Sequence, residues 1–306
     1  MEKEKRNKPV FKSVIQMVLM HLTPLLLFWS GLGTAFDWGL LVFMYFVRMF
    51  FVTGGYHRYF AHNTYSTSRF FQFLIAFCAQ TTVQKGALWW ASGHRVHHKN
   101  SDKPSDPHSN KIYGFFYSHI GWIIGPDFKE THYDLIRDFA KFPELVWLNK
   151  NHLVPAIITA FGVFFLGGYV NGGEFGVDFF EKGLPTLVIG FFISTVILFH
   201  GTFSINSLMH MIGGKRYETG DESRNSFILA LVTMGEGWHN NHHYYQSSTR
   251  QGFFWWEIDI TYYLLKTLSF LGLIWDLRPV PDYIKHSKNW EDAKRLQAEA
   301  KVAKAS

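Results

Sequence analysis

The 306-residue sequence contains a single cysteine, Cys78. One thiol excludes an intramolecular disulfide framework and any zinc or iron–sulfur site of the Cys-x-x-Cys kind. The sequence also lacks the His-Glu-x-x-His arrangement of zinc hydrolases, and it has no internal repeat or low-complexity segment. The net charge of +6 is modest and no basic stripe runs through a nucleic-acid-binding motif, so we expect no nucleic-acid partner.

Apolar runs are too few for a chain that lies mostly in lipid, and the mean hydropathy is only −0.03. We therefore expect a few membrane spans and a large aqueous part. Four runs predict transmembrane helices, over about 13–30, 38–56, 152–170 and 184–204. For the first run the alternative is a cleaved signal peptide, but no small-residue cleavage site follows it, so we expect a retained span. Arg48, near the end of the second run, is expected to snorkel toward the membrane interface.

Two more apolar segments predict helices that do not cross the membrane. The apolar part of residues 68–90 is too short to cross a bilayer, so we expect an interfacial or buried helix there and an interfacial helix over 252–275. Residues 252–275 include Glu257, Asp259 and Lys266, and charges in the middle of a span are costly. Residues 290–305 alternate alanine with charged side chains and predict either a solvated helix or a frayed tail.

Histidine is concentrated in a few short stretches. Nine imidazoles fall in four places: His57 and His62; His94, His97 and His98; His210, four residues after Asn206; and His239, His242 and His243. Positions i, i+3 and i+4 share one face of a helix, whereas a pair five residues apart needs a helix end or a loosened turn. A zinc site fills with about four ligands and an octahedral redox metal with about six. The count predicts two metal ions in one all-histidine cage, and imidazole suits iron, copper, zinc and nickel alike.

Several polar residues beside the histidines are candidates for supporting roles. Glu236 and Asp106 are carboxylates that could hold an imidazole from behind, with an ordinary salt bridge or helix cap as the alternative. Asn206 is a poor direct ligand, and we expect it to hold a metal-bound water. Arg58 and Arg95 are expected to pair with carboxylates.

The membrane topology can be tested against the metal hypothesis. The first two histidine clusters lie between spans two and three, and the last follows span four, so two crossings return the chain to the same side. The loops 31–38 and 171–183 carry one Lys or Arg between them, which places the basic segments, both termini and the histidines in the cytoplasm. We expect a single domain, 1–306, whose cytosolic cap comprises residues 57–151 and 205–306.

The sequence around these histidines resembles the membrane-bound fatty acyl desaturases of the stearoyl-CoA Δ9 type. The resemblance extends from about Trp38 to Val280. The matching motifs are Thr53-Gly-Gly-Tyr-His57, Trp90-Ala-Ser-Gly-His94, Asp106-Pro-His108, Asn206-Ser-Leu-Met-His210 and Gly235-Glu-Gly-Trp-His239.

The resemblance implies an all-α integral membrane protein with four transmembrane helices and a helical cytosolic cap that holds a histidine-rich di-iron site. The nine histidines would bind two Fe ions, with Asn206 acting through a water. The enzyme would insert a cis double bond into a saturated acyl chain by using O2 and two electrons. No His-Pro-Gly-Gly haem motif is present, so we expect an external donor such as ferredoxin or cytochrome b5 with its reductase.

The carrier of the acyl chain is less well specified. Animal acyl-CoA enzymes of this family have an acidic residue immediately before the second cluster, where this chain has Gly93. Acyl-CoA, desaturated at Δ9, is the first expectation, and an acyl chain of a membrane glycerolipid is the second. The competing functions are a di-iron membrane hydroxylase and, from a different class, a non-redox zinc lipid amidase or a metal transporter. The candidate substrate contacts are Trp89, Trp90, Arg95 and Lys99.

Overall fold

The computed structural model describes residues 9–126 and 130–305. Most of these residues are helical, and their only strands form a short antiparallel pair, β1 (Ser66–Thr67) with β2 (Ile274–Trp275). The α-helices are α1 Phe11–Leu22, α2 Leu27–Ser30, α3 Ala35–Phe50, α4 Arg69–Gln80, α5 Ala87–Asn100, α6 Asn110–Tyr113, α7 Trp122–Ile124, α8 Arg137–Ala140, α9 Pro143–Lys150, α10 Val154–Val170, α11 Val177–Thr186, α12 Ser194–Ser207, α13 Phe227–Val232, α14 His239–Tyr244, α15 Ile260–Phe270, α16 Asp282–Lys285 and α17 Trp290–Ala305. The 3-10 and π-helical segments are η1 Thr23–Leu26, η2 Phe51–Ala61, η3 Tyr117–Gly121, η4 Tyr133–Leu135, η5 Leu187–Ile193 and η6 Leu208–His210.

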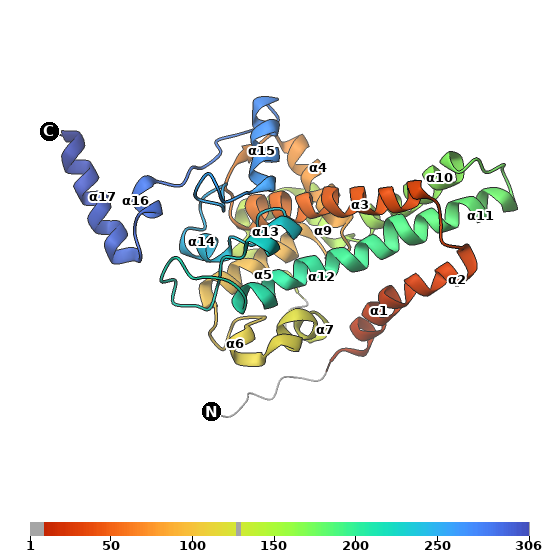
Figure 1. The fold of residues 1–306 in the computed structure, drawn as a ribbon, viewed down its shortest axis with the longest axis horizontal. Coiled ribbons are helices and arrows are strands. Elements are labelled where there is room, and N and C mark those ends of the chain that lie inside the picture. The colour runs from red at the N-terminus through yellow and green to blue at the C-terminus, as the bar shows by residue number, and fades with distance from the viewer. Residues whose placement is uncertain (1–8, 127–129, 306) are drawn as a thin grey trace.

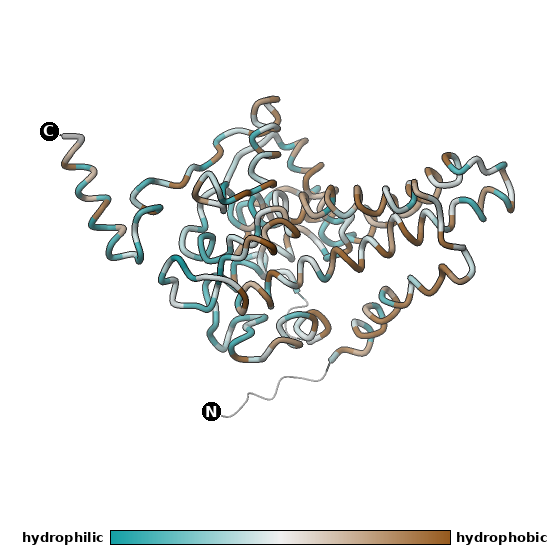
Figure 2. The backbone as a smooth tube through the Cα atoms, in the orientation of Figure 1, coloured by the Kyte–Doolittle hydropathy of each residue, from teal (hydrophilic) through white to brown (hydrophobic). Residues whose placement is uncertain are grey.

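Long apolar helices make up one end of the molecule, at the right in Figure 1. Among the described residues, three helices are long and apolar enough to cross a membrane: Phe11–Ser30, Ala35–Ala61 and Val177–His210. A fourth span exists if Pro143–Lys150 and Val154–Val170, which meet at a bend of 68°, are counted as one. The apolar colouring of α3 and α12 in Figure 2 fits this role. The chain is therefore a mostly helical protein with three or four candidate spans, and the count of four stays a prediction.

Small residues allow two of these helices to pack closely. A Cβ added at Gly167 of α10 would overlap the side chain of Thr186 on α11. The hydroxyl of this threonine donates a hydrogen bond to Asp37, a fully buried carboxylate that also closes the first turn of α3. Small residues at such contacts let helix backbones approach, and buried polar groups in this region need internal partners.

The cap lies at the other end, at the left in Figure 1, and packs around η2. Its main core joins η2 and α4 to α5, α9 and α15. Ser68 begins α4 by accepting a hydrogen bond from the backbone NH of Phe71. The interfacial or buried helix expected over 68–90 is divided into α4 and α5, which residues 81–86 separate. The helix expected over 290–305 is present as α17.

The expectation that Arg48 snorkels to the membrane interface is wrong. Its side chain is only 2% exposed and lies inside the helical bundle. The guanidinium donates to the hydroxyls of Ser194 and Thr195 and to the carbonyls of Met44 and Thr81. Because these oxygens satisfy its N–H groups internally, the side chain has no need to reach water.

The single surface helix expected over 252–275 is also wrong in extent. Only Ile260–Phe270 is helical, and the two acidic residues precede it. Asp259 caps this helix by accepting from the backbone NH of Tyr262, and it also binds Arg58. Glu257 binds Arg216, and both carboxylates are fully buried. The two acidic residues that argued against a span are paired inside the cap, whereas Lys266 lies exposed on α15.

Candidate metal centre

The end of the second long helix explains how two histidines five residues apart can act together. Residues Phe51–Ala61 form a π-helix, in which each N–H binds the carbonyl five residues earlier. The NH of His62 accordingly lies 3.1 Å from the carbonyl oxygen of His57. This wider turn places both imidazoles on one face, with ring centroids 4.8 Å apart.

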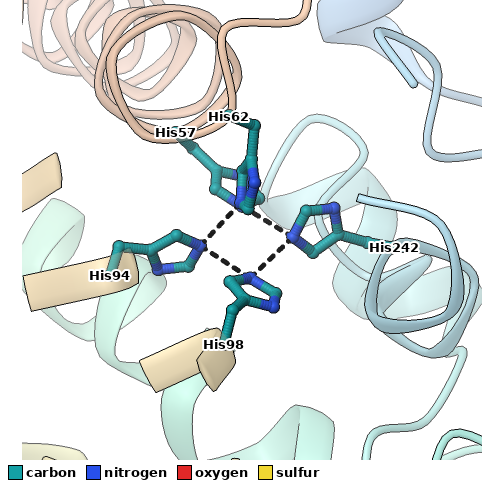
Figure 3. A group of neighbouring side chains, drawn as sticks. All are labelled: His57, His62, His94, His98 and His242. Carbon is teal, nitrogen blue, oxygen red and sulfur yellow. Dashed lines mark hydrogen bonds between the residues drawn. The ribbon is translucent and has the colours of Figure 1, made fainter. Parts of the chain in front are cut away.

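Five imidazoles meet at the end of this helix, as Figure 3 shows. This first histidine group consists of His57, His62, His94, His98 and His242, and one ring nitrogen from each lies within 4.8 Å of the others. Successive Nε2 atoms are 2.9–3.0 Å apart along the series His57, His242, His98, His94 and His62. The residues come from three separate parts of the chain: η2 with its C-terminal cap, α5 and α14.

Four further imidazoles form a second histidine group, made of His97, His210, His239 and His243. All four are buried, and the Nε2 atoms of His210 and His239 lie 3.1 Å apart. The two groups adjoin, because the rings of His98 and His243 are 4.6 Å apart. The nine histidines singled out from the sequence therefore all lie at one centre.

Helices α5 and α14 each contribute to both groups. On α5, His94 and His98 point to the first group and His97 to the second. On α14 the arrangement is reversed, since His239 and His243 point to the second group and His242 to the first. Residues at i and i+4 share a face more closely than residues at i and i+3, so each helix lies between the two groups.

Carboxylates lie behind four of these imidazoles and bind three of them. The Nδ1 atom of His57 lies 2.5 Å from Glu236, and that of His97 lies 2.9 Å from Asp106. A third contact was not anticipated from the sequence: His243 Nδ1 is 2.7 Å from Asp221. A carboxylate at Nδ1 fixes the tautomer in which Nε2 carries a lone pair. Asp102 lies farther from His210 Nδ1, at 3.7 Å, and this nitrogen has no hydrogen-bond partner among the described residues.

A buried arginine in turn binds the carboxylate that lies behind His57. Arg58 is 1% exposed and binds Glu236 at 3.1 Å and Asp259 at 2.9 Å. The Gln251 amide also donates to Glu236, at 2.9 Å. Arg58 thus compensates two buried negative charges, as expected from the sequence, and keeps Glu236 ionised behind His57.

The electrostatics suit a metal-binding site. Burial, followed by repulsion from neighbouring imidazoles, lowers the pKa of His94, His98, His239 and His242 well below the usual value. Burial also lowers the pKa of His243, to about 4, although Asp221 opposes the shift. Neutral imidazoles keep the lone pair that a metal needs.

The donor set fits a transition metal on independent grounds. The Nε2 atom of His243 is buried within the second group and has no hydrogen-bond partner among the described residues. Buried polar atoms of this kind are rare unless an unseen water or ion satisfies them. Nitrogen-only donor sets suit iron, copper, zinc or nickel and not the oxygen-seeking ions calcium and magnesium. Both groups can therefore hold a transition-metal ion.

A largely apolar cavity of about 510 Å³ leads to the first group, and His57 and His94 are part of its lining. This volume falls in the range of about 300–1,000 Å³ typical of ligand sites. Residues of α1, α5 and α12 form much of its wall. The cavity can place an apolar chain directly beside the histidines.

The sequence-predicted substrate contacts are distributed unevenly around this cavity. Trp89 and Trp90 line it, and Trp90 also stacks on His94 with ring centroids 4.9 Å apart. Asn206, predicted to hold a metal-bound water, lines the cavity as well. Arg95 is not part of the lining: it forms a salt bridge with Asp138 at 2.7 Å and donates to backbone carbonyls. Lys99 is exposed and also lies outside the lining.

Histidines that were absent from the predicted set have defined places as well. His108 lines the cavity, and its ring centroid lies 4.3 Å from that of His97. The sequence contains the motif Asp106-Pro-His108, but the spacing of this motif does not predict that His108 lines the cavity. His119 and His200 contact each other away from both groups, at 3.0 Å.

Comparisons with known proteins agree with this geometry. Residues 34–269 match the family model described as fatty acid desaturase. The chain is 34% identical over 284 residues to an sn-1 stearoyl-lipid 9-desaturase of Synechocystis sp., covering 89% of this chain and 79% of that protein. It is 34% identical over 282 residues to an sn-2 palmitoyl-lipid 9-desaturase of Nostoc sp., covering 88% and 91%. It is 32% identical over 248 residues to an acyl-CoA 5-desaturase of Anemone leveillei, covering 78% and 70%.

The family match covers most of the chain and includes all nine clustered histidines. Desaturation of a fatty acyl chain requires a metal site, an apolar cavity beside it and access to the membrane. The histidine groups, the cavity and the candidate spans meet these three requirements. The chain belongs to the fatty acid desaturase family and is a membrane-bound oxidoreductase that acts on a fatty acyl substrate.

Proposed function

We propose that the chain introduces a cis double bond at Δ9 of a saturated acyl chain carried by a membrane glycerolipid, with two irons held by the two histidine groups. The observation that carries the proposal is the pair of adjoining all-histidine groups beside an apolar cavity. The reaction converts –CH2–CH2–, O2, two electrons and two protons into –CH=CH– and two waters. When bound, the irons supply the activation of O2 that hydrogen removal from an unactivated carbon requires.

The ligand roles follow the two groups. His57, His62, His94, His98 and His242 would hold one iron, and His97, His210, His239 and His243 the other. Asn206 lines the cavity four residues before His210, where its amide would hold a water bound to the second iron. Glu236, Asp106, Asp221 and Asp102 would orient the imidazoles behind which they lie.

The carrier is proposed from the placement of cations. A CoA headgroup bears several phosphate charges, which arginine and lysine side chains recognise. Arg95 is bound to Asp138, Lys99 lies away from the cavity, and Gly93 lines the cavity without offering a side chain. Among the described residues, Lys85 is the one lysine or arginine in the cavity lining, with its Nζ 4.0 Å from the centre of the Trp89 ring, and one cation is fewer than the several phosphate charges of CoA call for. Relatives named as stearoyl-lipid and palmitoyl-lipid 9-desaturases also favour a lipid-borne chain and the Δ9 position. Acyl-CoA, the first expectation from the sequence, becomes the second, supported by the relative named as an acyl-CoA 5-desaturase.

The rest of the assembly is proposed from the chemistry and the charges. The site would face the cytoplasm together with both termini, as the charge asymmetry of the loops predicts. The two electrons would come from an external carrier such as ferredoxin, or cytochrome b5 with its reductase.

The test is expression in a host that lacks unsaturated fatty acids, with mass spectrometry of the lipids and metal analysis of the purified protein. A fatty acyl product lighter by two hydrogens, first appearing on intact glycerolipid, and about two irons per chain are expected. A product heavier by one oxygen would instead identify a hydroxylase. About one zinc and no iron, with no change in the lipids, would contradict the proposal and favour an amidase or a transporter.

A further inference from the structure

Three histidines outside the metal centre form a continuous chain between separate elements. His21 of α1 lies with its Nε2 3.0 Å from Nε2 of His200 on α12. The other nitrogen of His200, Nδ1, is 3.0 Å from Nε2 of His119 in η3. The chain ends at the Ser207 hydroxyl, 2.8 Å from Nδ1 of His119, and at the Met17 carbonyl, 2.8 Å from Nδ1 of His21.

The direction of the hydrogen bonds is fixed at both ends of this imidazole chain (His21, His200 and His119). The Met17 carbonyl accepts from Nδ1 of His21, and the Ser207 hydroxyl, which donates to the Phe203 carbonyl at 2.9 Å, accepts from Nδ1 of His119. The four contacts therefore need four N–H protons, whereas three neutral imidazoles supply three. A neutral chain leaves one contact without a proton, so it is weak enough to break and re-form.

The imidazole chain connects α1 to α12, and both helices line the apolar cavity. Ser13, Met17 and Met20 of α1 line the cavity, as do Phe199 and Phe203 of α12. Met20 directly precedes His21 in the sequence, and Phe199 directly precedes His200. The polar contact between the histidines therefore joins two helices that both line the cavity.

The wall made by α1 is otherwise loosely attached. No residue of α1 is fully buried, and Val18 and Leu22, which do not line the cavity, are 49% and 48% exposed. Among the described residues, His21–His200 is the one hydrogen bond from a side chain of α1 to another element. Because α1 belongs to a candidate span, its exposed face lies against lipid acyl chains, and one helix separates them from the cavity.

We propose that α1 is a movable side wall through which the acyl chain of a bilayer glycerolipid enters the cavity, and that the imidazole chain is its latch. The inference rests on the proposed function and adds the route of entry. A lipid keeps its headgroup at the membrane surface while its acyl chain passes between α1 and α12. The latch then closes the wall behind the chain.

The test uses His21→Cys with His200→Cys in a Cys78→Ser background, so that one protein can be studied with the wall free or tied. A short bifunctional thiol reagent with a reducible linker ties the two positions, and a reductant releases them. The protein is kept full-length, loaded with iron and reconstituted in phosphatidylcholine vesicles. The single variant His21→Cys, treated with the same reagent, is the matched control.

Two readouts are taken. One is desaturation of the vesicle lipid. The other, which needs no turnover, is photolabelling of the peptide that contains Thr202 and Asn206 by phosphatidylcholine with a diazirine in its acyl chain. Tying the wall is expected to lower both at least tenfold, and the reductant is expected to restore both. Labelling by a small water-soluble diazirine alcohol should stay unchanged.

Lipid labelling that persists in the tied protein would overturn the side entrance, whether or not the protein desaturates. Loss of labelling by the small alcohol as well would mean that tying collapses the cavity, and it would also overturn the inference. If lipid labelling behaves as expected but no alkene forms in the untied protein, the route stands and the proposed reaction fails.

Discussion

Asp221→Asn should weaken the second metal site while leaving the first intact. The Asp221 carboxylate lies 2.7 Å from Nδ1 of His243 and also accepts hydrogen bonds from the Ser223 and Thr219 hydroxyls. The side chain is buried, so the charge on this contact is poorly screened by water. Asparagine keeps the size but removes the charge, and its NH2 group can face Nδ1 and favour the wrong tautomer of His243.

The size of the effect can be worked from this geometry. Loss of a carboxylate behind a metal-bound imidazole costs about 10–100-fold in metal affinity, which corresponds to roughly 1.4–2.8 kcal/mol. A hydrogen bond to a charged group is worth about 1.5–3 kcal/mol, so two independent scales agree. No contact of Asp221 reaches the first histidine group, whose own carboxylate is Glu236.

The assay is metal content by mass spectrometry after dialysis against a graded series of chelator concentrations. Wild-type protein should lose the two proposed irons only at high chelator concentration. Asp221→Asn should lose one iron at a chelator concentration about 10–100-fold lower and keep the other. Asp282→Asn is the matched control, because Asp282 is highly exposed and its one ion pair among the described residues is with Lys285. Unchanged retention of both irons in Asp221→Asn, or loss of both together, would refute the reasoning.

Three further outcomes follow from separate parts of the structure. Arg58→Met should destabilise the protein by about 3–5 kcal/mol, since it leaves two buried carboxylates uncompensated, and an unchanged thermal unfolding midpoint would contradict this. Gly167→Ala should cost about 1–3 kcal/mol because its methyl would overlap a threonine on α11, whereas Gly162→Ala, with open space around it, should not; equal midpoints for the two variants would argue against close packing there. His98→Ala should abolish desaturation and remove one iron, whereas the exposed His286→Ala should change neither; a fully active His98→Ala protein would be incompatible with the proposed ligands.

Local spacing accounts for the part of the site that the sequence predicts. His94 and His98 are four residues apart on one helix, and His239 and His243 repeat that spacing, so each pair had to share a face. The pair His57 and His62 required a loosened turn, and a π-helix supplies it. The angle between side chains a few residues apart follows from helix geometry alone. The long helices can likewise be located from the apolar runs in the sequence.

The sequence could not predict which charged residues pair with the histidines and arginines of the site when the partners lie far apart in the chain. Asp102 reaches His210 across more than a hundred residues, and Arg58 reaches Asp259 across an even longer separation. Nothing in the local pattern distinguishes these side chains from the many charged residues on a cap. The snorkelling expected for Arg48 failed for the same reason, because its partners Ser194 and Thr195 lie on a helix far along the chain.

The sequence by itself determined the residue types, the spacing of the histidines and the family, because these depend on composition and on geometry within a few turns. Only the tertiary structure decided that His97 leaves its neighbours to join the second group, and that α1 covers the cavity with a histidine holding it in place. The physical reason is that a helix fixes the angle between its own side chains, whereas the partner that each side chain meets depends on how separate helices pack.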